Sequence, residues 1–407
     1  MSRALCALAG LCLLVLIAGL GGCGGMSEAV GTGVDTEGFK ADPQGRAPVL
    51  ILFQAPPGAA DEGVVQGLGG KVKQKYHLIP GMAAELPVAQ VDALRRHPRV
   101  RVVEPDGEVE ILAQTLPWGV DRVDAERVHP TNKGTGVKIA IVDTGIDYTH
   151  EDLVGNYADG VDLVATDGDE TPMDYSSHGT HCAGIAAAVD NEVGVVGVAP
   201  EASLYAVQVL NAAGMGVTSE VISGIQWCAD NGMQIVSMSF RMSDTESGRL
   251  TCDNAYAAGL LLVAAAGNYY SRKIADTVTV PARYDSVIAV AATDTRDARA
   301  SFSSTGPAVE LAAPGVDVNS CIPGGYGLKS GTSMACPHVA GAAALVWVAN
   351  PTMTAAQVRQ QLHSTALDLG GRKLIGRDPQ FGYGLLQADT AAGVLGLLAG
   401  VLGGGPA

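Results

Sequence analysis

The chain has 407 residues, of which 47% are hydrophobic and 17% charged, enough apolar side chain to build a sizeable core. Its formal net charge is -16, and it has no cluster of Lys and Arg of the kind that neutralises phosphates. These values indicate a globular chain of two or three folded units and exclude nucleic acid as an expected partner. An acidic surface of this kind mainly favours solubility.

The first residues have the pattern of a secretory signal peptide. Arg3 precedes an apolar run over 4–20, and small residues follow it. We therefore predict a signal peptide over 1–22 and an exported protein, whether extracellular, periplasmic or anchored to a membrane by lipid. The stretch LGGC resembles a bacterial lipoprotein cleavage site that would make Cys23 the lipidated first residue, although Gly21 departs from the more usual Ala or Ser. An uncleaved anchor and an ordinary signal peptide with an incidental cysteine are the alternatives.

The cysteines predict no metal site. Of the eight in the sequence, Cys6 and Cys12 lie in the predicted signal peptide and Cys23 at its end. An odd number remains, so at most two disulfides can form and one thiol stays free. Several of these cysteines lie in apolar, helix-like surroundings, where a small buried thiol is expected. The remaining residues are Cys182, Cys228, Cys252, Cys321 and Cys336.

A small α+β unit is predicted to follow a flexible linker. Residues 23–47 are rich in Gly and have no apolar period, which is typical of a tether. Residues 48–112 then read as strand, helix, two strands joined at a turn, helix and strand, the order of a ferredoxin-like fold. The predicted elements are 49–56, 61–70, 71–79, 81–87, 88–98 and 99–105.

A larger α/β domain is predicted over 113–391. Runs of Val, Ile and Ala alternate with helical segments, as in an open, mainly parallel sheet with helices on both faces. In such sheets, chemistry gathers where strands end. The tail 392–407 is too short and too rich in Gly to predict a membrane span, and we expect a frayed or weakly packed end. The predicted elements are 137–143, 178–189, 203–210, 221–232, 234–240, 254–260, 261–268, 287–293 and 334–350.

Three polar residues stand at the ends of these elements. Asp143 ends a strand, and His178 and Ser333 each begin a helix. A nucleophilic serine needs a base and a group that orients the base, and these are the residue types that this mechanism uses. Each residue has a simpler interpretation: an Asx turn at Asp143, helix caps around Ser333, or a metal held by His178 and His181.

The stretches around these residues resemble a known family. DTGID, HGTHCAG, AAAGN and GTSMACPHVAGAAAL are similar to the signature blocks of subtilisin-like serine proteases, in the same order. The resemblance runs from about residue 113 to 391. The unit over 48–112 resembles the inhibitory propeptide of that family. The resemblance of both units therefore implies a serine endopeptidase that acts on protein or peptide substrates and has its own propeptide as an intramolecular inhibitor. We expect a monomer.

The resemblance implies a role for each catalytic residue. Ser333 would attack the scissile carbonyl, His178 would take and return its proton, and Asp143 would hold the imidazole. Asn268 would donate its side-chain amide to the oxyanion. The position of Ser333 at the start of an apolar helix has its own physical meaning, because backbone N–H groups and the helix dipole there favour negative charge.

Two segments resemble the walls of the family's substrate pocket. An extended substrate would pair with backbone there, and side-chain pockets would give selectivity. Small residues leave room for a large apolar side chain, but Arg241 and Met242 stand where paired glycines are usual, which puts the specificity in doubt. The residues implied are Ser239, Phe240, Ala264, Ala265, Ala266 and Gly267.

The stretch AVDNEVGVVGVAP resembles the family's calcium-binding loop. An all-oxygen set suits a hard cation such as Ca²⁺, and a surface turn without metal is the alternative. The ligands implied are the side chains of Asn191, Gln114 and Asp152 and the carbonyls of Val189, Val193 and Val195.

The position of Gln114 also predicts the processing site. If Gln114 must reach the calcium loop, the new amino terminus should lie just before it. We predict cleavage between Leu112 and Ala113, with neighbouring bonds within two or three residues as alternatives.

Three other function classes compete with a serine protease. A non-catalytic binding module on the same fold would be expected to lack a catalytic residue, and none is missing. A nucleotide-binding protein would need a Gly-rich turn after a strand, whereas the Gly-rich stretch 133–136 precedes one. A zinc hydrolase using His178 and His181 would lose activity at once on chelation.

Overall fold

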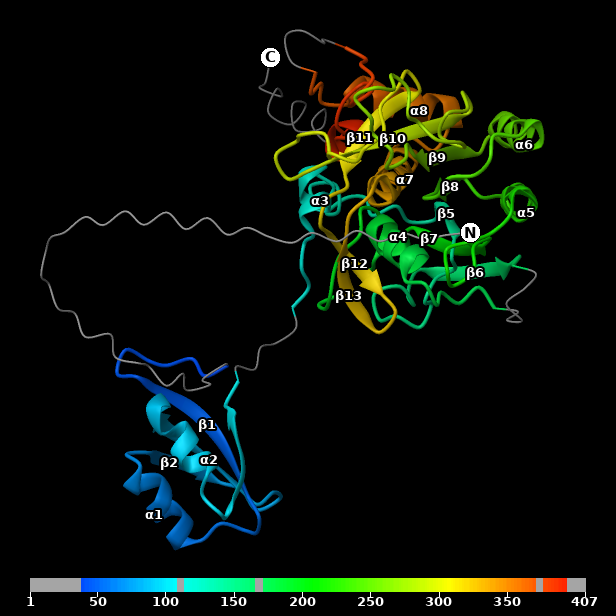
Figure 1. The fold of residues 1–407 in the computed structure, drawn as a ribbon. Helices are drawn as coiled ribbons and strands as arrows, with labels where there is room; N and C mark the ends of the chain where they lie inside the picture. Colours follow the sequence, from blue (N-terminus) through cyan, green and yellow to red (C-terminus); the bar gives the residue numbers. More distant parts are fainter. Residues whose placement is uncertain (1–37, 108–112, 165–170, 371–375, 394–407) are drawn as a thin grey trace, which may run out of the picture. The chain divides into compact units, whose positions relative to one another are not determined.

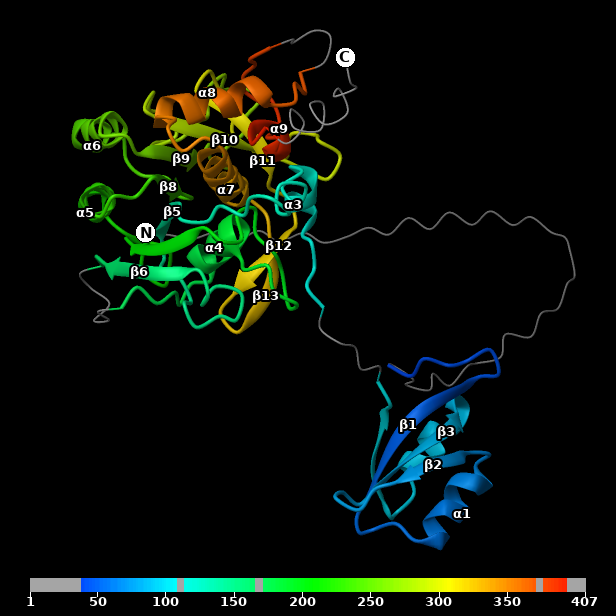
Figure 2. The same ribbon diagram turned by 180° about the vertical axis from the view of Figure 1, so that it is seen from behind.

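The computed structural model describes residues 38–107, 113–164, 171–370 and 376–393. They belong to two compact units that divide between Glu110 and Ile111. Figures 1 and 2 show both units from opposite sides. The predicted signal peptide, Cys23, Leu112 and most of the C-terminal tail lie outside the described residues.

The smaller unit has the predicted ferredoxin-like order. Its four strands form an antiparallel sheet in the order β2-β3-β1-β4. Alternate residues of β1 are buried, which is the period-two pattern of a strand with one face on a core. The elements are β1 (Arg46–Phe53), α1 (Ala59–Gly67), β2 (Lys71–Lys75), β3 (Gly81–Pro87), a 3₁₀ turn (Val88–Gln90), α2 (Val91–Arg95) and β4 (Val100–Pro105).

The packed part of this unit begins earlier than we predicted. Phe39 is 8% exposed and belongs to the unit's hydrophobic core, and the Arg95 guanidinium lies 5.3 Å from its ring centre. The ordered region therefore extends into the range that we predicted as a flexible linker. A single aromatic residue among glycines gave no periodic signal from which this could be read.

The larger unit is the predicted open α/β domain. Its seven-stranded sheet has the order β11-β10-β9-β8-β5-β7-β6, and every neighbouring pair is parallel. Its strands are β5 (Lys138–Asp143), β6 (Tyr157–Asp162), β7 (Ser203–Gln208), β8 (Ile235–Met238), β9 (Leu261–Ala265), β10 (Val287–Thr293), β11 (Val309–Pro314) and the hairpin β12 (Val318–Ile322) and β13 (Gly325–Lys329). Its helices are α3 (Trp118–Arg122), α4 (His178–Ala187), α5 (Thr218–Asp230), α6 (Glu246–Ala257), α7 (Thr332–Ala349), α8 (Ala355–Thr365) and α9 (Ala388–Ala391).

Helices cover both faces of this sheet. α5 and α6 lie on one face, and α4, α7 and α8 lie on the other (Figures 1 and 2). Along β5, Ile139 and Ile141 join the core under α4 and α7, while Ala140 and Val142 join the core under α5 and α6. A strand buried on both sides needs apolar residues at every position, which is why the sequence shows continuous runs and no alternation.

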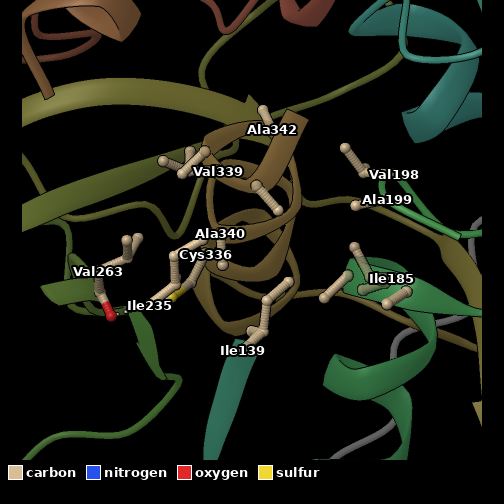
Figure 3. Packing of buried hydrophobic residues seen from close by; sticks show 14 of the residues in the cluster. Ile139, Ile185, Val198, Ala199, Ile235, Val263, Cys336, Val339, Ala340 and Ala342 are labelled. Atoms are coloured by element: carbon tan, nitrogen blue, oxygen red, sulfur yellow. Dashed lines mark hydrogen bonds between the residues drawn. The ribbon is translucent and has the colours of Figure 1, made fainter. Parts of the chain in front are cut away.

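Helix α7 lies at the centre of the larger core. Figure 3 looks at this helix with Val339 and Ala340 surrounded by side chains from the sheet and from α4, among them Ile139, Ile235 and Ile185. By length and composition it is the one helix in the described ranges that could cross a membrane, but most of it is buried inside this unit. Its all-round apolar composition is that of a core helix.

The five cysteines of the larger unit are all free thiols. Cys182, Cys228, Cys252, Cys321 and Cys336 are buried, and none forms a disulfide. Burial raises the pKa of each of these thiols. The expectation of small buried thiols is confirmed. The sequence allowed at most two disulfides, and these five cysteines form none.

Candidate active site

The first residue of α4 faces the carboxyl end of β5. His178 Nδ1 lies 2.7 Å from Asp143 Oδ1, and Asp143 is fully buried as the last residue of its strand. The side chain of His178 is 28% exposed, so its outer edge is accessible to solvent. The strand and the helix therefore bring together two residues 35 positions apart in the sequence.

Asp143 also raises the pKa of His178. Burial disfavours the charged imidazole, but the charge of Asp143 and its hydrogen bond outweigh this penalty, so the pKa lies above its usual value. A carboxylate that accepts from Nδ1–H leaves Nε2 as the proton acceptor of the neutral ring. The pair thus has the arrangement of a general base held by a carboxylate.

A second buried carboxylate, Asp174, fixes the start of α4. Its Oδ1 accepts from the backbone N–H groups of Ser176 and Ser177 at 2.8 and 3.0 Å, and its Oδ2 accepts from the Thr180 N–H at 2.8 Å. The Thr144 hydroxyl, next to Asp143, donates to it at 2.9 Å. Asp174 therefore holds the helix that carries His178 against the strand end that carries Asp143. We did not predict this residue, although an acidic residue just before a helix is a capping signal that could have indicated it.

Ser333 is the second residue of α7 and makes a reciprocal contact with Ser239. The Ser333 hydroxyl donates to the Ser239 carbonyl at 3.0 Å, and the Ser239 hydroxyl donates to the Ser333 carbonyl at 2.8 Å. The second bond has a specific cause. Pro337 lies four residues after Ser333 and has no N–H, so the Ser333 carbonyl lacks its helical donor. The Ser239 hydroxyl replaces this missing bond.

Asn268 lies three residues after the end of β9 and contacts the start of α7. Its Oδ1 accepts from the backbone N–H and the hydroxyl of Thr332, both at 3.0 Å. With the oxygen held in this way, the Nδ2 group remains available as a donor. This group lies close to Gly331, since a Cβ added to that glycine would be 3.4 Å from Nδ2. The site therefore offers a side-chain N–H next to the amino end of the helix that bears Ser333.

Two hollows adjoin these residues. The first, which we call the nucleophile pocket, has a volume of about 180 Å³ and is lined by Ser333, Asn268 and Ser239, among others. The second, the adjoining groove, has a volume of about 670 Å³ and includes His178 and Ser239. Ser239 lines both, so the two hollows meet where the catalytic candidates lie.

The predicted pocket residues are only partly brought together. Phe240, Ala265 and Gly267 line the nucleophile pocket with Ser239, whereas Ala264 and Ala266 are fully buried in the core under α5 and α6. The reason is the period of two along β9, which sends alternate side chains to opposite faces. The structure adds Arg241, Tyr269 and Thr279 to the lining, of which only Arg241 was noted from the sequence.

Three of the predicted calcium ligands lie around the Gln114 side chain. Gln114 Nε2 lies 2.9 Å from the Val189 carbonyl oxygen, 3.4 Å from Asn191 Oδ1 and 3.3 Å from the Val195 carbonyl oxygen. Asp152 is fully buried and accepts from the Asn191 amide and the Val195 N–H. Val193 lies in the same loop, and its N–H donates to Asn191 Oδ1. Neutral oxygens with a carboxylate beside them suit a hard cation.

His181 does not share a ligand position with His178. Its Nε2 lies 3.1 Å from the Val318 carbonyl and 3.0 Å from the Gly327 carbonyl, so this nitrogen donates to the β12–β13 hairpin. Burial lowers its pKa to about 4, which keeps the ring neutral. Its Nε2 therefore already has hydrogen-bond partners on the hairpin, and this argues against the zinc interpretation.

Comparison with known proteins agrees with this geometry. Residues 134–384 match the Subtilase family, and residues 61–112 match peptidase inhibitor I9. Subtilisin amylosacchariticus of Bacillus subtilis subsp. amylosacchariticus is 42% identical over 337 residues, 82% of this chain and 86% of that protein. An alkaline protease of Alkalihalobacillus alcalophilus is 43% identical over 321 residues, 78% of this chain and 80% of that protein.

A third relative is matched over its full length. Subtilisin DY of Bacillus licheniformis is 46% identical over 283 residues, 69% of this chain and all of that protein. The family match extends over more than half of the chain, and the relatives are covered over most of their length. The chain therefore belongs to the subtilase family of serine endopeptidases and carries an I9 inhibitor propeptide domain ahead of its catalytic domain.

Proposed function

We propose that the chain is an exported endopeptidase that cuts peptide bonds with Ser333, His178 and Asp143 as its catalytic residues. The observation that carries this proposal is the 2.7 Å contact between Asp143 and His178, with His178 in the adjoining groove and Ser333 in the nucleophile pocket. The buried carboxylate gives the imidazole a fixed tautomer, and a base held in this way is what a weak serine nucleophile requires.

The catalytic cycle follows from these positions. The Ser333 hydroxyl turns from the Ser239 carbonyl to His178 Nε2, transfers its proton there and attacks the scissile carbonyl carbon. The negative charge that forms on the carbonyl oxygen is met by the Ser333 backbone N–H and by the Asn268 amide, donors that are already oriented. His178 then gives its proton to the leaving amine, and water repeats the sequence to release the acyl group.

The smaller unit acts as the inhibitor until it is cut off. We infer that the chain cleaves itself between Leu112 and Ala113. The residues just after this bond are held in the catalytic unit, since the Gln114 N–H donates to the Glu192 carbonyl at 3.0 Å and the Thr115 N–H to the Gly194 carbonyl at 2.6 Å. A terminus at Ala113 leaves these contacts intact.

Self-cleavage provides the direct test. Purified wild-type chain from residue 24 onward is expected to split at or near Leu112–Ala113, as seen by intact mass, and Ser333→Ala is expected to remain whole. Ser330→Ala is the matched control, because Ser330 lies three residues away, is exposed and bonds Asp317. If the folded wild type stays whole in the presence of Ca²⁺, or if Ser333→Ala still splits, the assignment of Ser333 is wrong.

Calcium binding is proposed at the loop around Asn191. Turning the Gln114 amide would replace its Nε2 by Oε1 and complete a set of oxygens with Asn191, Asp152 and the carbonyls of Val189, Val193 and Val195. A cation bound there would neutralise buried Asp152 and tie the new amino terminus to the domain. It takes no part in the chemical step.

Removal of calcium should therefore lower stability before activity. Chelation of the processed wild type is expected to lower Tm by roughly 10 °C, the size of effect produced by a ligand held well above its Kd. In Gln114→Ala, the difference between the Tm measured with calcium and the Tm measured with chelator should shrink. Gln226→Ala is the control: Gln226 is an exposed glutamine on α5, and this difference in Tm should persist there. Immediate loss of activity at 25 °C with the fold intact would instead indicate a catalytic metal.

The amino-terminal targeting signal completes the proposal. The predicted signal peptide over 1–22 supports export, and Cys23 supports a lipid anchor that would hold the enzyme at a membrane surface. Mass analysis of the secreted or membrane-associated chain tests this, since acylation of Cys23 adds the mass of its fatty acyl groups.

A further inference from the structure

The two hollows of the active site differ in charge from the chain as a whole. The protein has a formal net charge of -16, yet no described residue that lines the nucleophile pocket or the adjoining groove is an aspartate or a glutamate. Arg241 lines both hollows and is the one Arg or Lys side chain among these residues. A negatively charged surface thus surrounds a site whose permanent charge is positive.

Arg241 is held over the pocket without a carboxylate partner. Its guanidinium carbon lies 5.4 Å from the centre of the Tyr269 ring, a cation–π contact between two residues that line the nucleophile pocket. None of the ion pairs between described residues involves Arg241, although most other arginines of the catalytic unit pair with an acid, as Arg249 does with Glu246. Its donors therefore remain available to a ligand.

The rest of the pocket limits the size of that ligand. The Thr279 side chain closes one wall, since a Cβ on Gly267 would lie 2.9 Å from both its methyl carbon and its hydroxyl oxygen. The pocket volume of about 180 Å³ suits a side chain of medium length. Phe240 and Ala265 offer apolar walls for its stem, and Arg241 belongs to the same lining.

We propose that Arg241 determines specificity, and that the enzyme prefers substrates with glutamate as the residue before the cut bond. This rests on the proposed function, because it assigns the nucleophile pocket to that residue. The methylene groups of the substrate side chain pack against Phe240 and Ala265, and its carboxylate accepts charge-assisted hydrogen bonds from the guanidinium. The apolar preference that the small residues suggested is replaced by a preference for an anion.

The test compares peptides that differ only at this position. The processed enzyme is assayed on acetyl-Ala-Ala-Pro-Xaa p-nitroanilides with Glu, Gln or Lys as Xaa. Glu and Gln have nearly the same shape, so the ratio of their kcat/KM values isolates charge. We expect Glu to exceed Gln by roughly 5- to 10-fold in the wild type, and the ratio to fall in 0.5 M NaCl because salt screens the pair.

Variants assign the effect to Arg241. Arg241→Gln should bring the Glu to Gln ratio to about 1, mainly by lowering kcat/KM for the Glu peptide, and Arg241→Glu should favour Lys. Arg296→Gln makes the same change of charge at an exposed site and should keep the wild-type ratio.

The outcomes separate the two proposals. A wild-type ratio of 1 or less, or a preference for Glu that survives in Arg241→Gln, overturns the specificity while the protease remains. Failure of the wild type to cut any of the peptides, or to process itself, overturns the proposed function and the specificity together.

Discussion

Replacing His178 with alanine is expected to lower kcat by roughly 10⁶-fold, the size of loss known for subtilisin when its base is removed. Without Nε2 as a proton acceptor, the Ser333 hydroxyl stays protonated at neutral pH and is a poor nucleophile. The buried carboxylate of Asp143 cannot replace the lost base, because it acts on Ser333 only through the imidazole of His178. The residual rate should come from substrate binding and the oxyanion donors alone.

The measurement needs enzyme that does not depend on its own activity for release. A cleavage sequence for an unrelated protease, inserted before Ala113, frees wild type and variant in the same way. His129→Gln serves as the control, because His129 is half-buried, bonds the Val198 carbonyl and lines neither hollow. Retention of more than about a thousandth of the wild-type rate in His178→Ala would contradict its role as the base.

Asp143→Asn should produce the second largest loss, about 10⁴-fold in kcat, because an amide can donate to the imidazole and stabilise the wrong tautomer. It also changes the pH profile in a direction that the structure specifies. In the wild type His178 must be neutral to act, and its pKa is raised, so kcat/KM should appear only as pH rises through a value above the usual 6.5.

Removing the carboxylate reverses that shift. The asparagine variant loses both the charge and the charged hydrogen bond that raise the pKa, and the remaining burial of His178 lowers it. The acid limb of kcat/KM should therefore move to lower pH while the plateau falls. Asp159→Asn, on the exposed edge strand β6, should leave both unchanged. An acid limb that stays in place would show that Asp143 does not set the pKa of His178.

The sequence allowed the positions of these residues to be predicted because polar residues follow apolar runs at each of them. Asp143 ends a continuous buried strand, and Ser333 lies in the first turn of an apolar helix, so the change from apolar to polar residues marks both sites. The small unit was also predictable, since β1 alternates and short turns separate its elements. In each case, the local pattern and the fold require the same residue types.

Elements without such a pattern were missed. β6 (Tyr157–Asp162) is an edge strand with two aspartates and a glycine, and its exposed side needs no apolar residues. The β12–β13 hairpin was missed for a related reason, because β13 is rich in glycine and mostly half-exposed. These elements are recognisable by their partners in space, which the sequence of the segment alone does not reveal.

The chemical environment of the site depends still more on distant residues. Thr279 reaches the pocket from a loop after β9, and Asp174 reaches the start of α4 from four residues upstream. The contact between Arg241 and Tyr269 joins two loops that follow different strands. Residue types alone could indicate a nucleophile and a base, whereas the shape and charge of the pocket required the fold.

The position of Ser333 on the central helix has a consequence for the thermal inactivation of the enzyme. Most surface segments of a protein open and close far below its melting point, and sites built on them lose alignment early. Ser333 lies in the first turn of α7, which is buried for most of its length among the strands of the sheet and α4. Helix α7 cannot unwind beyond Ser333 without disrupting the packing of the core. Thermal inactivation should therefore coincide with global melting, and the slowest-exchanging amides of the molecule should lie within a few turns of its nucleophile.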